Sequence, residues 1–121
     1  MGSDLFHEKD KRGFDRRQLY YYLKVTHDPT GGLAGYLGDI STEGLMLFTK
    51  NQIELDTVQH FRINLNDGFG LDEDLLFEAR SVWTEKDANP DYHIIGFKFI
   101  DLDQAGIDIV KYLMKKYGFE E

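Results

Sequence analysis

The sequence predicts a mostly β domain in which about six antiparallel strands form a barrel or a sandwich and one helix follows them. Short segments between residues 19 and 100 alternate apolar and polar residues with a period of two, and turn-forming residues separate them. After residue 103 the apolar residues recur every three to four positions, which is the spacing of an amphipathic helix. The chain has 121 residues, 41% of them hydrophobic, so it is long enough for a single domain with its own core.

The first three strands are expected in the N-terminal half of the chain. Residues 19–26 alternate regularly and are rich in Tyr, Leu and Val, so they predict the first strand. Residues 27–32 contain Asp, Pro and two Gly, a composition typical of a turn. The second strand is predicted over residues 33–39 and the third over residues 45–49, with a sharp corner between them.

Three further strands are expected before the helix. Residues 61–65 alternate cleanly, and the Asn-Asp-Gly sequence at residues 66–68 is expected to end that strand. Residues 75–85 and 92–100 are predicted to form the two strands of a hairpin. The loop between them, residues 86–91, contains the turn-forming sequence Asn-Pro-Asp.

The C-terminal helix is expected to begin after Asp103 and to end before Gly118. Asp103 suits the N-cap position, because its carboxylate can accept a hydrogen bond from the first backbone N–H groups. Gly118 suits the C′ position, where the backbone often becomes left-handed. Lysines near the C-terminal end suit the negative end of the helix dipole. These are Lys111, Lys115 and Lys116, and the apolar stripe consists of Ile107, Val110, Leu113 or Met114, and Tyr117.

The composition excludes several classes of protein. The chain has no cysteine, which excludes disulfides and thiolate chemistry and fits a cytoplasmic protein. No apolar run approaches the ~20 residues of a membrane-spanning helix, and there is no hydrophobic signal core, so no membrane insertion is expected. The net charge of −8 argues against binding of nucleic acid. No metal site is expected, because the histidines lie on four separate segments, at His7, His27, His60 and His93.

The charge is unevenly distributed along the chain. Residues 9–17 carry a net charge of +3, which leaves −11 for the rest of a chain whose total is −8. A small cationic patch on an acidic body favours a compact anion over a long polyanion as ligand. The basic residues of the patch are Lys9, Lys11, Arg12, Arg16 and Arg17.

Within this patch, Arg12 and Arg16 form an Arg-x-x-x-Arg motif. A guanidinium is planar and permanently charged, and it can hold a phosphate through two parallel hydrogen bonds. Two such groups four residues apart can converge on one phosphodiester or hold two. The motif alone is also compatible with a solvated basic tail, and Asp15 could pair with one of the arginines.

The second motif, Asp-x-Ser-x-x-Gly, occupies the corner between the second and third strands as Asp39, Ser41 and Gly44. A carboxylate can accept hydrogen bonds from both N1–H and N2–H of guanine, and the serine hydroxyl can reach a base or a phosphate. Gly44 permits a turn with positive φ and a close approach of backbone to ligand. The alternative is a purely local turn in which Asp39 and Ser41 bond to neighbouring amides.

Taken together, the two motifs and the layout of strands and helix resemble the PilZ domain family, whose members bind the bacterial second messenger cyclic di-GMP. The resemblance implies a six-stranded antiparallel barrel with a C-terminal helix, over residues 9–118. Residues 1–8 are then a flexible leader, with first residues of the kind that cloning leaves behind, and residues 119–121 are a tail. By this resemblance Arg12 and Arg16 contact the phosphates of the ligand and stack on its guanines.

The resemblance also identifies further candidates for ligand binding. Lys11 and Arg17 flank the arginine motif, and the residue before that motif influences whether one or two cyclic di-GMP molecules bind in the family. Some members place an aromatic residue where this chain has Trp83. Strict alternation, however, puts Trp83 on the same face as Ser81, where it would complete the core. It puts Arg80 on the opposite face, where this side chain could reach the same groove.

We therefore expect a non-enzymatic, cytoplasmic, bacterial sensor that needs no cofactor. On binding cyclic di-GMP it is expected to clamp the arginine segment over the barrel and to present a changed surface to an unidentified effector protein. The alternative is an interaction module with a PilZ fold that acts without ligand. A hydrolase is disfavoured, because the chain has no nucleophile elbow, zinc-binding helix or phosphate-binding glycine loop.

Overall fold

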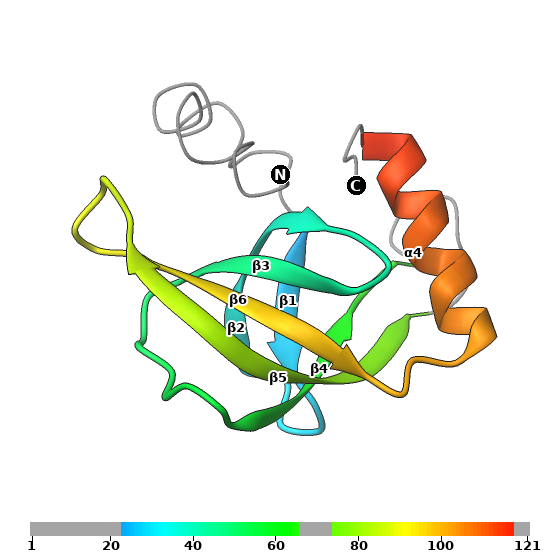
Figure 1. The fold of residues 1–121 in the computed structure, drawn as a ribbon, viewed down its shortest axis with the longest axis horizontal. Helices are drawn as coiled ribbons and strands as arrows, with labels where there is room; N and C mark the ends of the chain where they lie inside the picture. Colours follow the sequence, from blue (N-terminus) through cyan, green and yellow to red (C-terminus); the bar gives the residue numbers. More distant parts are fainter. Residues whose placement is uncertain (1–22, 66–73, 118–121) are drawn as a thin grey trace.

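A computed structural model of the protein describes residues 23–65 and 74–117 (Figure 1). Within these residues the chain forms six strands and one helix, in the predicted order. The strands are β1 (Lys24–His27), β2 (Leu33–Ile40), β3 (Gly44–Thr49), β4 (Val58–Ile63), β5 (Leu75–Lys86) and β6 (His93–Ile100), and the helix is α4 (Gln104–Tyr117).

The six strands close into an antiparallel barrel in the order β1-β2-β3-β6-β5-β4. The predicted mostly β fold is confirmed, and of the two arrangements that strand spacing allowed, the protein adopts the barrel. Closure depends on the short strand β1, which pairs with β2 on one side and with β4 on the other. Val25 of β1 lies opposite both Gly35 and Ile63.

The bounds of β4 differ from the prediction. Alternation indicated residues 61–65, whereas the strand spans Val58–Ile63. Residues 58–60 are exposed or only partly buried, so their hydrophobic pattern is weak, and their pairing with β5 is what makes them a strand. Three other predicted features lie outside the described residues: residues 19–22 of the first strand, the turn at 66–68, and Gly118.

The core fills the inside of the barrel. At its centre the Phe61 ring meets Phe97 edge to face, with ring centroids 5.1 Å apart, and tilts against Phe77 at 5.7 Å. Such offset and edge-on ring pairs are the favoured arrangements of aromatic side chains. The core residues with no exposed surface are Val25, Leu37, Leu47, Phe61, Ile63, Leu65, Ala79, Ile95, Val110 and Leu113.

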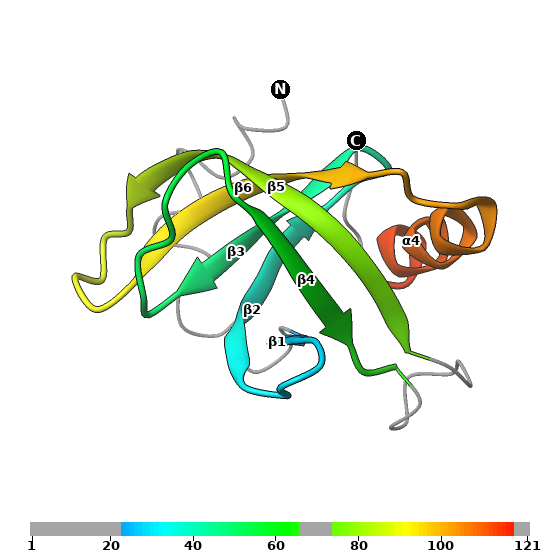
Figure 2. The same ribbon diagram turned by 90° about the horizontal axis from the view of Figure 1, so that it is seen from below.

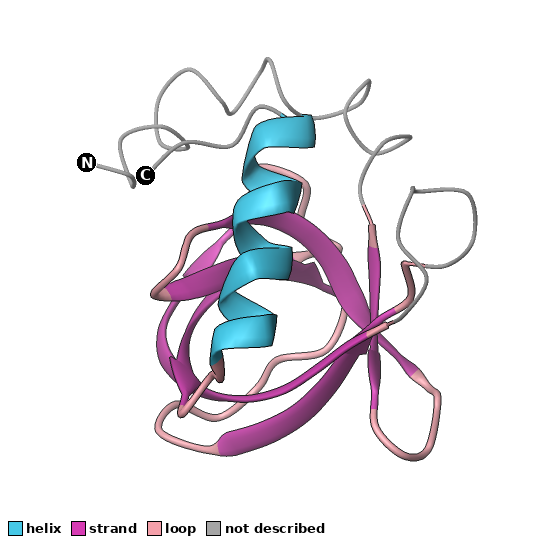
Figure 3. Ribbon diagram, turned by 90° about the vertical axis from the view of Figure 1, so that its right-hand side faces the viewer, coloured by secondary structure: helices cyan, strands magenta, loops and turns pink. Residues whose placement is uncertain are grey.

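Helix α4 lies across one end of the barrel (Figure 3). Val110 and Leu113, two residues of the predicted apolar stripe, are fully buried there. Asp103 is the N-cap, as predicted, because its Oδ1 accepts a hydrogen bond from Gly106 N–H at 2.8 Å. The β5–β6 hairpin extends beyond the barrel at the opposite end (Figures 1 and 2). The described part of the chain contains no helix long and apolar enough to cross a membrane.

Candidate functional site

A β-bulge in β2 turns Asp39 to the outer surface of the barrel. Leu37 lies opposite Leu47, but Asp39 lies opposite Met46, so Gly38 is an extra residue without a partner in β3. A regular strand would put Asp39 on the same face as Leu37, inside the core. A Cβ on Gly38 would lie 2.6 Å from Cε2 of the Phe48 ring and close to the terminal methyl carbon of Met46, so these side chains would have to shift to admit a larger residue.

A second bulge, in β5, does the same for Trp83. Ser81 lies opposite Phe97, but Trp83 lies opposite Gly96, so Val82 is the extra residue. The expectation from strict alternation, that Trp83 completes the core, is therefore wrong. The indole instead covers Gly96 on the outer face, where a Cβ on that glycine would lie 2.2 Å from Trp83 Nε1.

The two bulges place Asp39 and Trp83 in one cross-strand row on the outer surface. Asp39 of β2 lies opposite Met46 of β3, Met46 lies opposite Gly96 of β6, and Gly96 lies opposite Trp83 of β5. Three strand spacings separate the ends of this row, or roughly 14 Å along the sheet. The Asp39 carboxylate and the Trp83 indole thus lie at the two ends of this row. The two residues between them, Met46 and Gly96, are apolar and project little above the sheet.

A groove of about 340 Å³ runs over this row. Its volume is at the lower end of the range typical of ligand sites. Three residues of the corner motif line it together with Trp83, so the structure brings four of the sequence-predicted site residues to one place. The polar and aromatic lining residues are Asp39, Ser41, Glu43, Trp83, Phe97 and Lys98, with Gly44 and Gly96 among the others.

The corner that carries the motif is fixed by local hydrogen bonds. Asp39 Oδ1 accepts from the N–H of Ile40 at 2.9 Å, and Ser41 Oγ accepts from the N–H of Glu43 at 3.1 Å. The bonds expected of a local turn are thus present on the same side chains that line the groove. Among the described residues these bonds use one carboxylate oxygen and one lone pair of the hydroxyl, and within this part of the chain the second carboxylate oxygen and the hydroxyl proton can serve a ligand.

Gly44 has a different role from the one expected. Among the described residues, positive φ occurs at Gly31, Asp56 and Asp101, and not at Gly44. Gly44 is the first residue of β3, and a Cβ there would lie 2.0 Å from the carbonyl oxygen of Phe97. The glycine is therefore needed for the close approach of β3 and β6 beside the groove, and not for a left-handed turn.

Burial raises the pKa of the Asp39 carboxyl from 3.8 to about 6, and the hydrogen bond from the Ile40 N–H partly opposes this shift. The carboxylate form predominates at pH 7, but it is held in a partly desolvated position. A ligand that donates hydrogen bonds to this carboxylate, or that brings a positive charge close to it, would favour the ionised form. The charge of Asp39 is thus expected to respond to such a ligand.

Arg80 of β5 and Lys98 of β6, which pair in the sheet, differ in their position relative to the groove. Arg80 was a possible ligand-binding residue, but it does not line the groove, and its Nη1 lies 3.2 Å from Asp56 Oδ1 on the outer surface. Lys98 does line the groove, directly opposite Gly44 in the sheet. Sequence reasoning missed Lys98. Alternation with Phe97 would have placed it on the outer face, but its position beside the corner follows only from the pairing of β3 with β6.

The remaining candidates, Lys11, Arg12, Arg16 and Arg17, lie outside the described residues. Among residues 23–65 and 74–117, no group of three or more histidine or acidic side chains is arranged to hold a metal ion. The one histidine with an acidic neighbour at ion-pair distance in this part of the chain is His60, whose Nδ1 lies 3.5 Å from Glu78 Oε2.

The closed barrel and its lateral groove define a small β-barrel domain with a candidate ligand site on its wall. The chain belongs to the PilZ domain family, because the family model matches residues 10–115, a range that includes both motifs. Comparison with curated proteins gave no match.

Solved structures with the same fold include the inhibitor of motility MotI/DgrA of Bacillus subtilis, with a TM-score of 0.65 and 12% sequence identity over 79% of this chain and 47% of that one. The PilZ domain of YcgR from Escherichia coli, solved with c-di-GMP, has a TM-score of 0.58 and 12% identity over 78% of this chain and 79% of that one. A second structure of YcgR from Escherichia coli, with a longer chain and also in complex with c-di-GMP, has a TM-score of 0.58 and 12% identity over 80% of this chain and 41% of that one. The chain thus spans less than half the length of MotI/DgrA and of the longer YcgR.

Proposed function

We propose that this protein is a cytoplasmic, non-enzymatic receptor for cyclic di-GMP. The single observation that carries the proposal is the cross-strand row that puts the Asp39 carboxylate and the Trp83 indole on one groove. A guanine needs an acceptor for its N1–H and N2–H groups and gains from an aromatic surface beside its face. Membership of the PilZ family and the c-di-GMP complexes of YcgR with the same fold support this choice of ligand.

In this proposal each part of the site has one task. Asp39 accepts hydrogen bonds from a guanine edge and Ser41 donates one from its hydroxyl. Trp83 stacks against a base, a contact that contributes about 1–3 kcal/mol in single-strand nucleic acid binding. Arg12 and Arg16 hold the phosphates through charge-assisted hydrogen bonds, each contributing about 1.5–3 kcal/mol.

The proposed signal to an effector depends on the position of the two arginines in the sequence. Arg12 and Arg16 precede β1, whereas the groove lies on β2, β3, β5 and β6. When the ligand bridges the two, the arginine segment closes over the barrel and the protein gains a new surface for an effector. The alternative function, a PilZ module that acts without ligand, is favoured by the local hydrogen bonds of Asp39 and Ser41.

Calorimetry with cyclic di-GMP tests the proposal. Wild type should bind in the micromolar range or tighter, Arg16→Ala should lose at least about tenfold in affinity, and Lys9→Ala is the control for charge at the same end of the chain. Absence of binding heat at tens of micromolar ligand, or equal affinity of Arg16→Ala and wild type, would exclude this receptor and favour the ligand-independent module.

Lys98 is expected to strengthen binding modestly. It is exposed beside the groove, so its attraction to a phosphate should be partly screened, and Lys98→Ala should weaken binding roughly two- to fivefold. The difference from wild type should shrink as salt is added. Lys111→Ala, which removes an exposed lysine from α4, is the control. Equal affinities of Lys98→Ala and wild type at low salt would remove Lys98 from the site.

A further inference from the structure

The face of β5 on which the Trp83 side chain lies depends on a single position in that strand. Before the bulge, the strand points Phe77, Ala79 and Ser81 inward. If β5 were regular here, Val82 would pair with Gly96 and Trp83 would lie opposite Ile95, which is fully buried in the barrel. A shift of one residue therefore exchanges the two faces for the whole tip of the strand. The position of Trp83 therefore requires interactions that keep the bulge at Val82.

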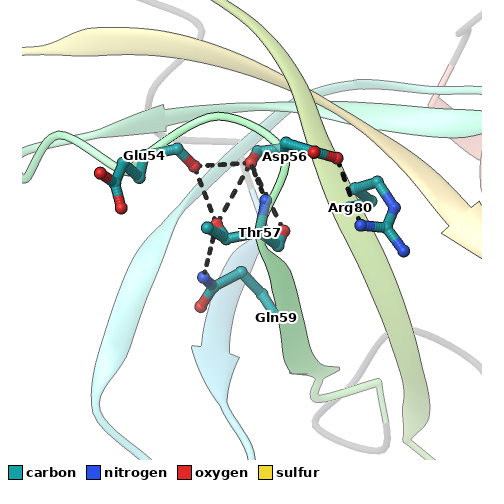
Figure 4. Close-up of polar contacts among 6 residues, drawn as sticks. Glu54, Asp56, Thr57, Gln59 and Arg80 are labelled. Carbon is teal, nitrogen blue, oxygen red and sulfur yellow. Dashed lines mark hydrogen bonds and ion pairs between the residues drawn. The ribbon is translucent and has the colours of Figure 1, made fainter.

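The loop that carries Glu54, Asp56 and Thr57 (Figure 4) forms hydrogen bonds with β5 at the residue just before the bulge. Ser81 is almost fully buried, with 1% of its surface exposed. Its Oγ donates to the Glu54 carbonyl at 2.7 Å and accepts from Thr57 N–H at 3.1 Å. Its backbone carbonyl accepts from Asp56 N–H at 2.7 Å, and its N–H donates to the Thr57 carbonyl at 3.0 Å.

The 54–57 loop is itself held in a fixed shape. The Thr57 hydroxyl donates to the Glu54 carbonyl at 2.8 Å and accepts from Gln59 Nε2 at 3.3 Å. Asp56 adopts a left-handed conformation with φ of 62° and receives the ion pair from Arg80 at 3.2 Å (Figure 4). The buried Ser81 hydroxyl can form its hydrogen bonds to this loop only in the observed register of β5.

We propose that Ser81 is a positioning residue, which anchors β5 to the 54–57 loop and so keeps the Trp83 indole over Gly96 in the groove. Pairing on the β4 side of β5 continues through this loop as far as Ser81, and the bulge begins at the next residue. The effect on ligand binding rests on the proposed receptor function. The effect on the position of Trp83 does not, since it concerns the free protein.

The test uses Ser81→Ala with Thr49→Val as the matched control. Thr49 is equally buried, at 1% exposed, and its hydroxyl also donates to a loop carbonyl, that of Asn51 at 2.8 Å, but it does not line the groove. The position of the chain's single tryptophan is read from the nuclear Overhauser effect between the Trp83 indole and the Gly96 α-protons. Cyclic di-GMP affinity is measured by calorimetry.

Ser81→Ala is expected to lose the indole–Gly96 signal in part or whole and to bind roughly five- to tenfold more weakly, while Thr49→Val keeps both. An unchanged signal in Ser81→Ala overturns the proposal, whatever happens to the affinity. If Ser81→Ala does not fold, Thr57→Val and Thr57→Ser form the second pair, and only Thr57→Val should weaken the signal. A wild type that does not bind cyclic di-GMP refutes the receptor but leaves the indole signal to decide on Ser81.

Discussion

Asp39→Asn is expected to bind cyclic di-GMP roughly 30- to 150-fold more weakly than wild type and yet to be the more stable protein at pH 7. The affinity falls because an amide presents one acceptor and one donor where guanine presents two donors, so one good contact becomes a clash of N–H groups. A loss of about 2–3 kcal/mol lies in the upper part of the range of about 1.5–3 kcal/mol for hydrogen bonds to a charged group.

The gain in stability has a separate cause. Folding raises the pKa of Asp39 from 3.8 to about 6 because it desolvates the carboxylate, so the ionised form is less favourable in the folded state than in the unfolded chain. Asparagine carries no charge and can still accept the Ile40 N–H bond. After allowance for the partial exposure of this side chain, Asp39→Asn should raise the free energy of unfolding at pH 7 by about 1–2 kcal/mol.

The pH dependence has a definite sign. Between pH 3.8 and about 6 the folded state binds more protons at Asp39 than the unfolded state does, so this group makes the protein less stable as the pH rises through that window. The difference in unfolding free energy between Asp39→Asn and wild type should therefore be small near pH 4 and reach its full value above pH 6. Chemical denaturation at several pH values measures this difference, with Asp91→Asn, a change in an exposed loop, as control.

Ligand binding should show the opposite trend. The complex requires the ionised carboxylate, so the affinity of wild type should decline as the pH falls below about 6, by up to about tenfold per pH unit. Asp39→Asn should lack this decline. If Asp39→Asn binds as tightly as wild type, or if it is less stable at pH 7, the role given to the Asp39 carboxylate is wrong.

Gly96→Ala should also weaken ligand binding strongly. A Cβ at this position would lie 2.2 Å from Nε1 and 2.3 Å from Cε2 of Trp83, so the indole must leave its place over β6. If the indole stacks on a base, its displacement should lower the affinity for cyclic di-GMP about tenfold, within the range of about 1–3 kcal/mol for one stacked base.

A double-mutant cycle separates this effect from a general disturbance of β6. Gly96→Ala is combined with Trp83→Ala, and in that background the glycine substitution should change the affinity little, because the group it displaces is gone. Gly32→Ala is the control for the substitution itself, since the nearest atom to its Cβ would be Thr30 Oγ1 at 3.9 Å. Equal losses in both backgrounds would show that Gly96 acts on β6 and not through Trp83.

Alternation of side chains was sufficient to predict the β-rich fold and the amphipathic helix, because burial of one face imposes a period on the sequence. It could not predict the bulges. The sequence around Val82 continues to alternate, so Trp83 was predicted to point inward, and the bulge at Gly38 that turns Asp39 outward is likewise visible only in the strand register. Val58 was not predicted as part of β4 for a related reason. An exposed strand residue follows no burial pattern, and only its backbone pairing with the next strand shows that it belongs to the sheet.

The residues of the candidate site also differ in whether the sequence could predict them. Asp39 and Ser41 could be predicted because they belong to one short motif at a corner. Lys98 belongs to no motif, and its place beside that corner arises because β3 pairs with β6, strands far apart in the sequence. The position of Trp83 over Gly96 similarly depends on contact between two strands and on the buried hydroxyl of Ser81.

The central claim is that cyclic di-GMP occupies the groove between the Asp39 corner and Trp83. Titration of the isotope-labelled protein with this ligand, followed by two-dimensional NMR, tests it directly. The largest shifts should fall on the amides of Asp39, Ser41 and Gly96 and on the Trp83 indole N–H. A spectrum that does not change, or shifts confined to the β4 surface around His60, would contradict the account.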